Sequence, residues 1–290
     1  MTASWSATIR FPERVAVPGG HSIAVASREG RGAPVLAVHA TGFCKEMWGP
    51  VAALLAPHPV VAPDQRGHGD SSVPSPPCDW WDLGRDVLAV VDACGLEGPV
   101  GVGHSSGAAA LAMAEILRPG TFASLLLIEP IIFPFAGVRT EDNPMTRAAL
   151  RRRRVFASAD EAAAALRGRG AFAGWAEEAL ALYAAHAFRA APEGWVLKCS
   201  PEVEGEFYRG ATAHGAWARL HEITCPLVLA AGAESESHPA PFLEAMRDRF
   251  GAARLEVVAG AGHFVPMERP EAVAALAVPL LGPEAGAPRR

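Results

Sequence analysis

A serine flanked by glycines has the surroundings that most strongly suggest covalent chemistry. Gly103-His104-Ser105-Ser106-Gly107 fits the pattern G-x-S-x-G, a sharp turn that presents a serine hydroxyl above the end of a sheet. Residues 98–102 are typical of a short buried strand, and residues 108–117 are typical of a helix. Glycines on both sides of the turn let strand and helix approach closely. The pattern predicts a nucleophile at Ser105; the alternative is a glycine turn without chemistry.

A serine hydroxyl is a weak nucleophile unless a base removes its proton and a third group orients that base. We expect His263 to be the base, because it lies in a glycine-rich loop directly after the last predicted strand, residues 254–258. In such sites the histidine follows the serine and the acid in the chain. The chain has ten histidines, so most of them must be surface or packing residues.

The elements that must position these residues alternate between strands and helices. Strands are predicted at residues 14–17, 22–27, 34–38, 59–63, 98–102, 123–128, 226–231 and 254–258, and helices at 46–56, 79–94, 108–117, 240–250 and 270–280. Such alternation predicts an α/β fold whose mainly parallel sheet is covered by helices on both faces. Ligands bind beyond the carboxyl ends of the strands in folds of this kind.

The stretch from residue 133 to residue 220 has a different composition. It is rich in alanine, arginine and aromatic residues, and no buried strand is evident in it. We therefore expect a helical insertion, with residues 1–132 and 221–290 forming the core. The four arginines at 151–154 are interpreted as a solvated helix face.

Composition limits the class of protein. Half of the 290 residues are apolar and a fifth are charged, which suits a large core and argues against disorder. The formal net charge of −5 gives no reason to expect nucleic acid as a partner. Five single cysteines without a C-x-x-C pair argue against a disulfide framework or a zinc ribbon.

Two further features bear on location. The most apolar stretch, residues 125–135, contains Glu129, Pro130 and Pro134, which prevent it from spanning a bilayer. The N-terminal residues do not have the pattern of a secretory signal. We expect a soluble, cytoplasmic protein without a membrane partner.

The chain resembles the α/β-hydrolase superfamily along nearly its whole length. Four segments carry the resemblance: His39-Ala40-Thr41-Gly42-Phe43, Asp64-Gln65-Arg66-Gly67-His68-Gly69-Asp70-Ser71, the turn at Ser105, and Gly262-His263-Phe264. The resemblance implies a mostly parallel eight-stranded sheet with a helical lid inserted after strand 6. It also implies an oxyanion hole made by the backbone N–H groups of Thr41 and Ser106, facing the charge that develops on a carbonyl oxygen. Ala40 departs from the family's usual glycine.

The resemblance leaves two positions for the acid that orients the histidine. The commoner one follows the strand after the insertion, as Gly-x-x-Asp; here it holds Ser235, with Glu234 and Glu236 on either side. The other directly follows the sixth strand, where Glu129 stands, as in zearalenone-lactonase-like hydrolases. A carboxylate that ends a buried strand needs a partner, and His263 would be one. We favour Glu129 and keep Glu234 or Glu236 as alternatives; a structural ion pair is the noncatalytic interpretation of Glu129.

These residues together point to a serine hydrolase that cleaves an ester or lactone of an apolar small molecule through an acyl-enzyme. Aromatic residues of the lid would exclude water and form apolar walls. The expected substrate contacts are His39, Phe43, His104, Ile132, Phe133, Trp175 and Phe264.

Other functions remain open at this point. The same groups would serve an acyltransferase or a hydrolase of amide or carbon–carbon bonds, and a ligand receptor with slow turnover is an alternative of a different class. Serine at the nucleophile position argues against epoxide hydrolase and dehalogenase chemistry. The chain has no G-x-G-x-x-G opening a helix after its first strand, no Walker A and no H-E-x-x-H motif, so we expect neither a cofactor nor a metal.

Overall fold

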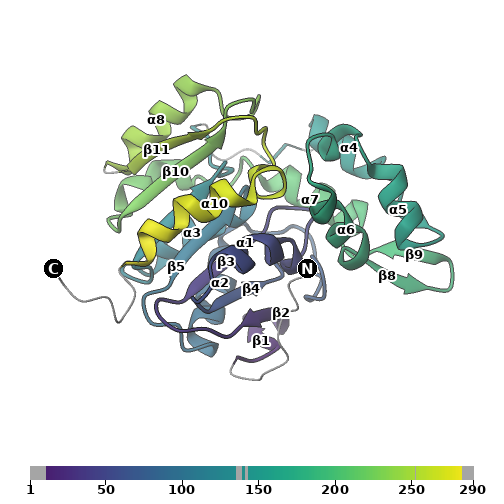
Figure 1. The fold of residues 1–290 in the computed structure, drawn as a ribbon, viewed down its shortest axis with the longest axis horizontal. Coiled ribbons are helices and arrows are strands. Elements are labelled where there is room, and N and C mark those ends of the chain that lie inside the picture. Colours follow the sequence, from purple (N-terminus) through teal and green to yellow (C-terminus); the bar gives the residue numbers. More distant parts are fainter. Residues whose placement is uncertain (1–10, 135–138, 141–142, 252, 283–290) are drawn as a thin grey trace.

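Eight strands form the central sheet of the molecule (Figure 1). The computed structural model describes residues 11–134, 139–140, 143–251 and 253–282. The spatial order is β1-β2-β4-β3-β5-β6-β10-β11, where the strands are Arg14–Val17, His21–Arg28, Val60–Pro63, Val35–Val38, Val100–His104, Ser124–Ile128, Leu227–Gly232 and Ala253–Val258. Strand β2 is antiparallel to both β1 and β4, and all other pairs are parallel. The predicted mostly parallel eight-stranded sheet is therefore confirmed.

The central strands are buried along their whole length. Every residue of β3, β4, β5 and β6 is buried. Strands that are covered by helices on both faces have continuous apolar runs. Apolar and polar residues therefore do not alternate along these strands. This explains why the sequence predicted these strands to within a few residues.

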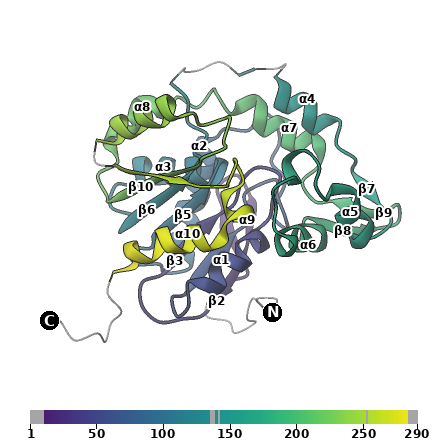
Figure 2. The ribbon, with the colours of Figure 1, turned by 45° about the horizontal axis from the view of Figure 1, so that its top comes forward.

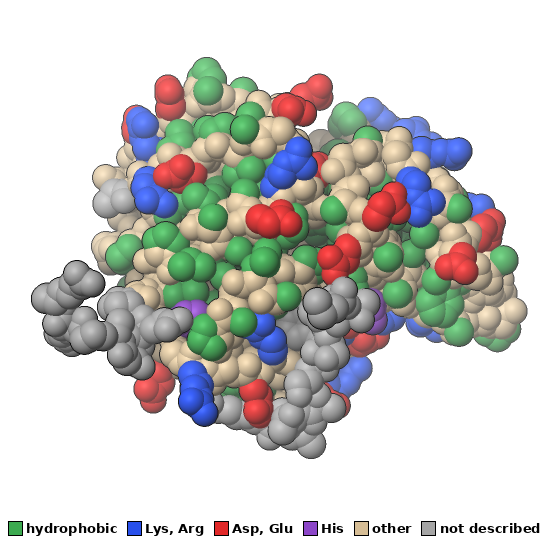
Figure 3. All heavy atoms as spheres, viewed as in Figure 1, with side chains coloured by type: hydrophobic (Ala, Val, Ile, Leu, Met, Phe, Trp, Pro, Cys, Tyr) green, Lys and Arg blue, Asp and Glu red, His purple; other side chains and the backbone are tan. Residues whose placement is uncertain are grey.

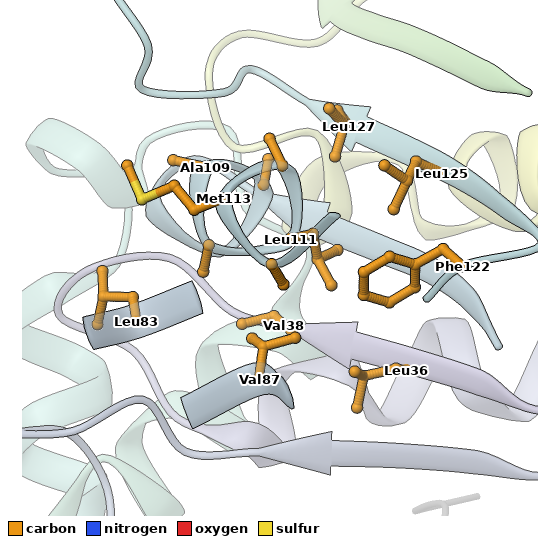
Figure 4. Close-up of a cluster of buried hydrophobic side chains, with 14 of the residues drawn as sticks. Leu36, Val38, Leu83, Val87, Ala109, Leu111, Met113, Phe122, Leu125 and Leu127 are labelled. Carbon is orange, nitrogen blue, oxygen red and sulfur yellow. The ribbon is translucent and has the colours of Figure 1, made fainter. Parts of the chain in front are cut away.

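Two layers of helices cover the sheet. Helices α2 (Trp81–Ala93), α3 (Ser106–Leu117) and α8 (Ala240–Phe250) pack on one face, and α1 (Gly49–Leu54) and α10 (Pro270–Ala277) on the other (Figure 2). Figure 4 shows part of the first interface, where Leu83 and Val87 of α2 and Leu111 of α3 meet Leu36 and Val38 of β3. Helix α3 is buried from Ser106 to Ile116, which its run of alanines permits.

The helix expected at residues 46–56 is divided. A 3₁₀ helix, η1 (Lys45–Trp48), leads into α1, and Pro50 stands in the first turn of α1. Proline has no N–H to donate and suits the start of a helix rather than its middle. Two further short elements near the C-terminus are α9 (Val265–Glu268) and the 3₁₀ helix η4 (Val278–Leu281).

The segment between β6 and β10, called the insertion below, contains strands as well as helices. Its elements are α4 (Pro144–Leu150), β7 (Val155–Phe156), α5 (Ala159–Leu166), η2 (Gly170–Phe172), α6 (Glu177–His186), β8 (Phe188–Ala191), β9 (Gly194–Leu197), α7 (Pro201–Gly210) and η3 (Ala216–Glu222). The antiparallel sheet β7-β9-β8 corrects the expectation of a purely helical insertion. These strands are at most four residues long and only partly buried, so they carry neither a long apolar run nor clear alternation.

A third apolar cluster joins the insertion to the loops at the carboxyl ends of the strands. Phe43, Cys44 and Met47 follow β3 and pack with Trp175, Tyr183 and Phe188 of the insertion and with Met267 of α9; these residues are all buried. The insertion lies at one end of the sheet in both views (Figures 1 and 2).

Acidic and basic side chains are interspersed over the face drawn in Figure 3. Within the described ranges, every helix is too short or too polar to cross a bilayer.

Candidate active site

Ser105 sits in a strained turn between β5 and α3. Its backbone has φ 56° and ψ −115°, a conformation that side chains rarely adopt. The flanking glycines are required: a Cβ on Gly107 would lie 2.2 Å from Val38 O, and one on Gly103 would lie 2.7 Å from the backbone of Ala108. Strain of this kind is found where a side chain must be held in a functional position.

Glu129 directly follows β6 and is bound to His263. His263 Nδ1 donates a hydrogen bond to Glu129 Oε2 over 2.9 Å. The Glu129 side chain is 0% exposed, whereas that of His263 is 24% exposed. Gly232, at the end of neighbouring β10, donates its N–H to Glu129 Oε1 over 2.9 Å. Strand β10 pairs in parallel with β6 and with β11, which Glu129 and the His263 loop follow respectively. The pairing therefore places the carboxylate and the histidine at the same edge of the sheet.

The segment of His263 also lies against the turn of Ser105. His104 Nε2 donates to His263 O over 2.8 Å, and the two rings are 5.1 Å apart between centroids. Ser105 N donates to Ile128 O over 2.8 Å, which fixes the turn beside Glu129. The structure thus brings the predicted serine, histidine and acid segments together from three distant parts of the chain.

The alternative acids do not face the histidine. Glu234 and Glu236 are exposed. The serines beside them bind Glu129 instead, with Ser235 Oγ donating over 2.7 Å and Ser237 Oγ over 3.0 Å. Of the three glutamates considered, Glu129 alone contacts His263 in the described part of the chain.

The charge state of Glu129 follows from its neighbours. Burial alone would raise the pKa of this carboxyl, but the neighbouring imidazoles of His238 and His263 outweigh burial and hold the pKa well below its usual range. Glu129 is therefore ionised at neutral pH and can stabilise a positive charge on His263.

His238 is a site residue that the sequence did not indicate. Its Nδ1 lies 2.8 Å from Glu129 Oε2, and its Nε2 donates to Pro130 O over 3.1 Å. The ring is buried. No motif or spacing in the sequence distinguishes it from the other nine histidines.

The loop expected to supply one side of the oxyanion hole is held by side chains. His39 Nδ1 donates to Ala40 O over 2.8 Å, and His39 Nε2 accepts from Gln65 N over 3.0 Å. Gln65 Nε2 donates to Ser106 Oγ over 3.0 Å, so it joins this loop to the start of α3. Because Ser106 lies in the first turn of α3, its N–H has no acceptor inside the helix.

His39 therefore has a different place from the one expected. Both ring nitrogens are occupied by the protein, and burial lowers the pKa of His39 to about 4, which keeps it neutral. These contacts make it a support of the loop around Thr41 rather than a wall of a substrate site.

Asp64, in the second of the motif segments, organises the loop beneath the site. Its carboxylate accepts hydrogen bonds from Lys45 N over 2.7 Å, Lys45 Nζ over 2.8 Å and Asp70 N over 2.8 Å. A Cβ on Gly69 would lie 2.1 Å from this carboxylate, which explains the glycine at that position. These contacts give the segment a structural role.

Four of the expected substrate contacts form one aromatic group. Ring centroids are 5.3 Å apart for Phe43 and Trp175, 5.9 Å for Phe43 and Phe264, and 6.5 Å for Phe43 and His104. The other two lie elsewhere: Ile132 is fully buried in the core, and Phe133 stacks on Phe242 of α8 at 5.7 Å.

A buried polar network links the insertion to the same loop. Tyr183 OH donates to Gly42 O over 3.3 Å and accepts from Arg152, which pairs with Glu204. The backbone beside Thr41 is thereby attached to α6 and α7.

Comparison with known proteins agrees with this architecture. A model of the alpha/beta hydrolase family matches residues 35–276. The non-heme chloroperoxidase of Streptomyces lividans is 32% identical over 116 residues, which are 39% of this chain and 41% of that protein. The bifunctional esterase/perhydrolase DCH of Acinetobacter calcoaceticus is 40% identical over 86 residues, 29% of this chain and 30% of that protein. The chain thus matches less than half the length of these curated relatives.

Solved structures extend the likeness over the whole fold. E-2-(acetamidomethylene)succinate hydrolase superposes with a TM-score of 0.78 and 21% identity, covering 93% of this chain and 98% of that one. The enol-lactonase from Burkholderia xenovorans LB400 gives 0.69 and 19%, covering 93% and 100%. At these identities the likeness establishes the fold.

Proposed function

Because this chain belongs to the alpha/beta hydrolase family, we propose that it is a serine hydrolase that cleaves esters or lactones of apolar small molecules through an acyl-enzyme. The observation that carries the proposal is the 2.9 Å hydrogen bond from His263 Nδ1 to the buried Glu129, beside the strained turn at Ser105. Nucleophile, base and acid in that order are the groups that acyl transfer requires.

The proposed chemistry follows from the proton positions. With Nδ1–H directed at Glu129, Nε2 is the nitrogen of His263 that is left to accept the Ser105 proton. Ser105 Oγ then attacks the substrate carbonyl, and the N–H groups of Thr41 and Ser106 stabilise the oxyanion. His263 gives its proton to the leaving alcohol and next activates the water that releases the acid. Glu129 stabilises the imidazolium in both half-reactions.

The substrate class rests on the aromatic group and on the relatives. Phe43, Trp175 and Phe264 offer apolar surface beside His104, next to the nucleophile. We propose that residues 133–220 act as a lid, since Trp175 comes from the insertion. The names of similar proteins include an esterase/perhydrolase, a lipase and an enol-lactonase, which supports ester or lactone cleavage.

The test uses p-nitrophenyl acetate and butyrate with the full chain. We expect turnover by the wild type and a loss of at least about 10⁴-fold in kcat for Ser105→Ala, because no nucleophile remains. Ser106→Ala is the matched control, since it retains the nucleophile and its own backbone N–H. A fluorophosphonate should label the wild type and Ser106→Ala but not Ser105→Ala. Turnover that is unchanged in Ser105→Ala would refute the proposal, and ligand binding without turnover would favour a receptor.

A further inference from the structure

Glu129 Oε2 has more polar neighbours than orientation of one histidine requires. Ser235 Oγ lies 2.7 Å away, His238 Nδ1 2.8 Å, His263 Nδ1 2.9 Å and Ser237 Oγ 3.0 Å. A carboxylate oxygen has two lone pairs, so it cannot accept well-directed hydrogen bonds from Ser235, Ser237 and His263 all at once. A cation among these atoms would be bound by the lone pairs of the same oxygen and nitrogen atoms.

The same atoms are spaced as metal ligands would be. Ser237 Oγ lies 3.0 Å from His238 Nδ1 and 3.2 Å from His263 Nδ1. The ligand atoms of Glu129, His238 and His263 all lie within 4.8 Å of one another. Tetrahedral ligands about 2.0–2.1 Å from zinc are about 3.3 Å from each other. Ligand atoms that already lie within 4.8 Å of one another can reach this spacing by small side-chain movements.

We propose that Glu129 Oε2, His238 Nδ1 and His263 Nδ1 bind a divalent transition-metal ion such as Zn²⁺, and that the bound ion inhibits the hydrolase. Ser237 Oγ or a water would complete the coordination. Two imidazoles and one carboxylate suit zinc, copper or nickel better than magnesium or calcium. The binding part stands on its own, whereas the inhibition part rests on the proposed function.

The groups around the ligands support this assignment. His238 Nε2 donates to Pro130 O over 3.1 Å, which turns Nδ1 toward the carboxylate. Glu129 Oε1 accepts from Gly232 N over 2.9 Å, which leaves Oε2 for the ion. Metal-binding histidines commonly donate their second N–H to a backbone carbonyl in this way. His263 is 24% exposed and Ser237 is exposed, so an ion can enter from solvent.

Inhibition would follow from a change of tautomer. An ion on His263 Nδ1 takes the lone pair of that nitrogen, so the ring proton must be on Nε2. Nε2 then has no lone pair with which to accept the Ser105 proton. The proton on His263 Nδ1 moves to Nε2 by exchange with solvent, whereas His238, whose Nε2 donates to Pro130 O, binds the ion through the lone pair on Nδ1. The ion would thus block the base without occupying the space of the substrate's acyl group.

No sequence motif predicted this metal site, because its ligands follow three strands that are far apart in the chain. They follow β6, β10 and β11 respectively, and meet only because these strands are neighbours in the sheet. The proposed site therefore departs from the expectation that no metal is bound.

Binding is tested first, without any reliance on activity. In a chain carrying Ser105→Ala and Cys225→Ser, the nucleophile and the partly exposed thiol are removed while the three ligands remain. Titration with ZnCl₂ should show one site with a Kd on the order of micromolar or tighter. Co²⁺ should give visible absorption bands typical of four nitrogen and oxygen ligands. The variant His238→Asn should weaken binding by more than about tenfold, and the exposed control His221→Asn should not.

Activity is tested second, with p-nitrophenyl acetate and the wild type. At a Zn²⁺ concentration of about 100 times Kd, the rate should fall about 100-fold, and excess EDTA should restore it. Each variant is compared with its own metal-free rate, and His238→Asn should need more than about tenfold more zinc for the same fractional loss.

Three results would overturn the inference. They are an absence of Zn²⁺ and Co²⁺ binding up to 1 mM in the titrations, binding that is unchanged in His238→Asn, and binding that leaves the rate unaffected. If His238→Asn does not fold, the Co²⁺ spectrum of the wild type decides the ligand type. A chain that binds zinc as described but hydrolyses no ester would contradict the proposed function and leave the metal site standing.

Discussion

Ser105 and Glu129 are the two non-glycine residues with positive φ in the described part of the chain. Each directly follows a strand, and these strands, β5 and β6, are neighbours. Such conformations cost about 1–3 kcal/mol each. Backbone hydrogen bonds hold them: Ser105 N donates to Ile128 O over 2.8 Å, and Glu129 N donates to Ala230 O over 2.9 Å. Strain at these two residues is best explained by the orientation that their side chains need.

Glu129→Gln tests the acid at the residue scale. An amide of the same size cannot stabilise the His263 imidazolium, and its NH₂ can push the ring into the wrong tautomer. We expect kcat for p-nitrophenyl acetate to fall about 10³-fold to 10⁴-fold. Glu234→Gln and Glu236→Gln are matched controls that should stay within about twofold, since both side chains are exposed. A larger loss in either control than in Glu129→Gln would assign the acid elsewhere.

The site was predictable from sequence only where local pattern determines geometry. The glycines around Ser105 and the loop position of His263 indicated their places. The sequence favoured Glu129 over Glu234 or Glu236, and the structure adds the pairing of β6 with β10, which brings Gly232 and Glu129 together. No sequence pattern predicted the role of His238, because it lies in a loop of serines and glutamates. Such a loop has no hydrophobic periodicity from which the direction of its side chains could be inferred.

At the scale of elements, the start of α3 determines the position of Ser105, the proposed nucleophile. Gly107 packs against the end of β3, and Gly103 packs against Ala108. These contacts leave no space for a side chain, so strand and helix are fixed relative to each other.

Gly107→Ala should therefore destabilise the fold and displace Ser105. The added Cβ would lie 2.2 Å from Val38 O, so α3 must move. We expect the free energy of unfolding in urea to fall by about 1–3 kcal/mol, with a parallel loss of kcat. The control is Gly205→Ala in α7, where the Cβ would find its nearest neighbours at 3.6 Å and should stabilise the helix by about 0.5–1 kcal/mol. Equal unfolding free energies for Gly107→Ala and the wild type would contradict the packing described.

The fold was more predictable than the insertion for a physical reason. Strands such as β3 and β6 are buried on both faces, and burial forces a continuous apolar run on them. The hairpin of β8 and β9 is only partly covered, and its stability comes from neighbours such as Phe156, which packs edge-on against Phe188 at 5.5 Å. Such contacts join residues that are distant in the chain, so the local periodicity of the sequence does not predict them.

At the scale of the whole molecule, burial shifts the pKa values of several titratable groups toward the uncharged form. Burial lowers the pKa of His39 to about 4, of His68 to about 3 and of His214 to about 4. Burial also raises the pKa of Asp64 to about 6, although Lys45 lies against it. Since the ordinary values are about 6.5 for histidine and 3.9 for aspartate, folding changes the number of bound protons.

The stability of the molecule should consequently fall as the pH is lowered from 7 to 5. In this window the unfolded chain protonates the three histidines while the folded protein keeps them neutral, so protons favour unfolding. Asp64 acts in the opposite direction below pH 6, because its folded form binds the proton. The three histidines outweigh Asp64. Each net proton taken up on unfolding lowers the free energy of unfolding by about 1.4 kcal/mol per pH unit. Urea unfolding at pH 7, 6 and 5 should show a decreasing midpoint.

The variant His214→Asn tests whether protonation of the buried histidines, rather than low pH in general, causes the loss of stability. His214 Nε2 donates to Ile131 O over 3.0 Å, and its Nδ1 accepts from Ala216 N over 3.2 Å. Asparagine can accept the second of these bonds through an Asx turn but has no proton to gain in this range. The slope of unfolding free energy against pH should decrease by about one proton, or 1.4 kcal/mol per pH unit. An unchanged slope, or a midpoint that rises toward pH 5 in the wild type, would mean that these histidines are not held neutral by the fold.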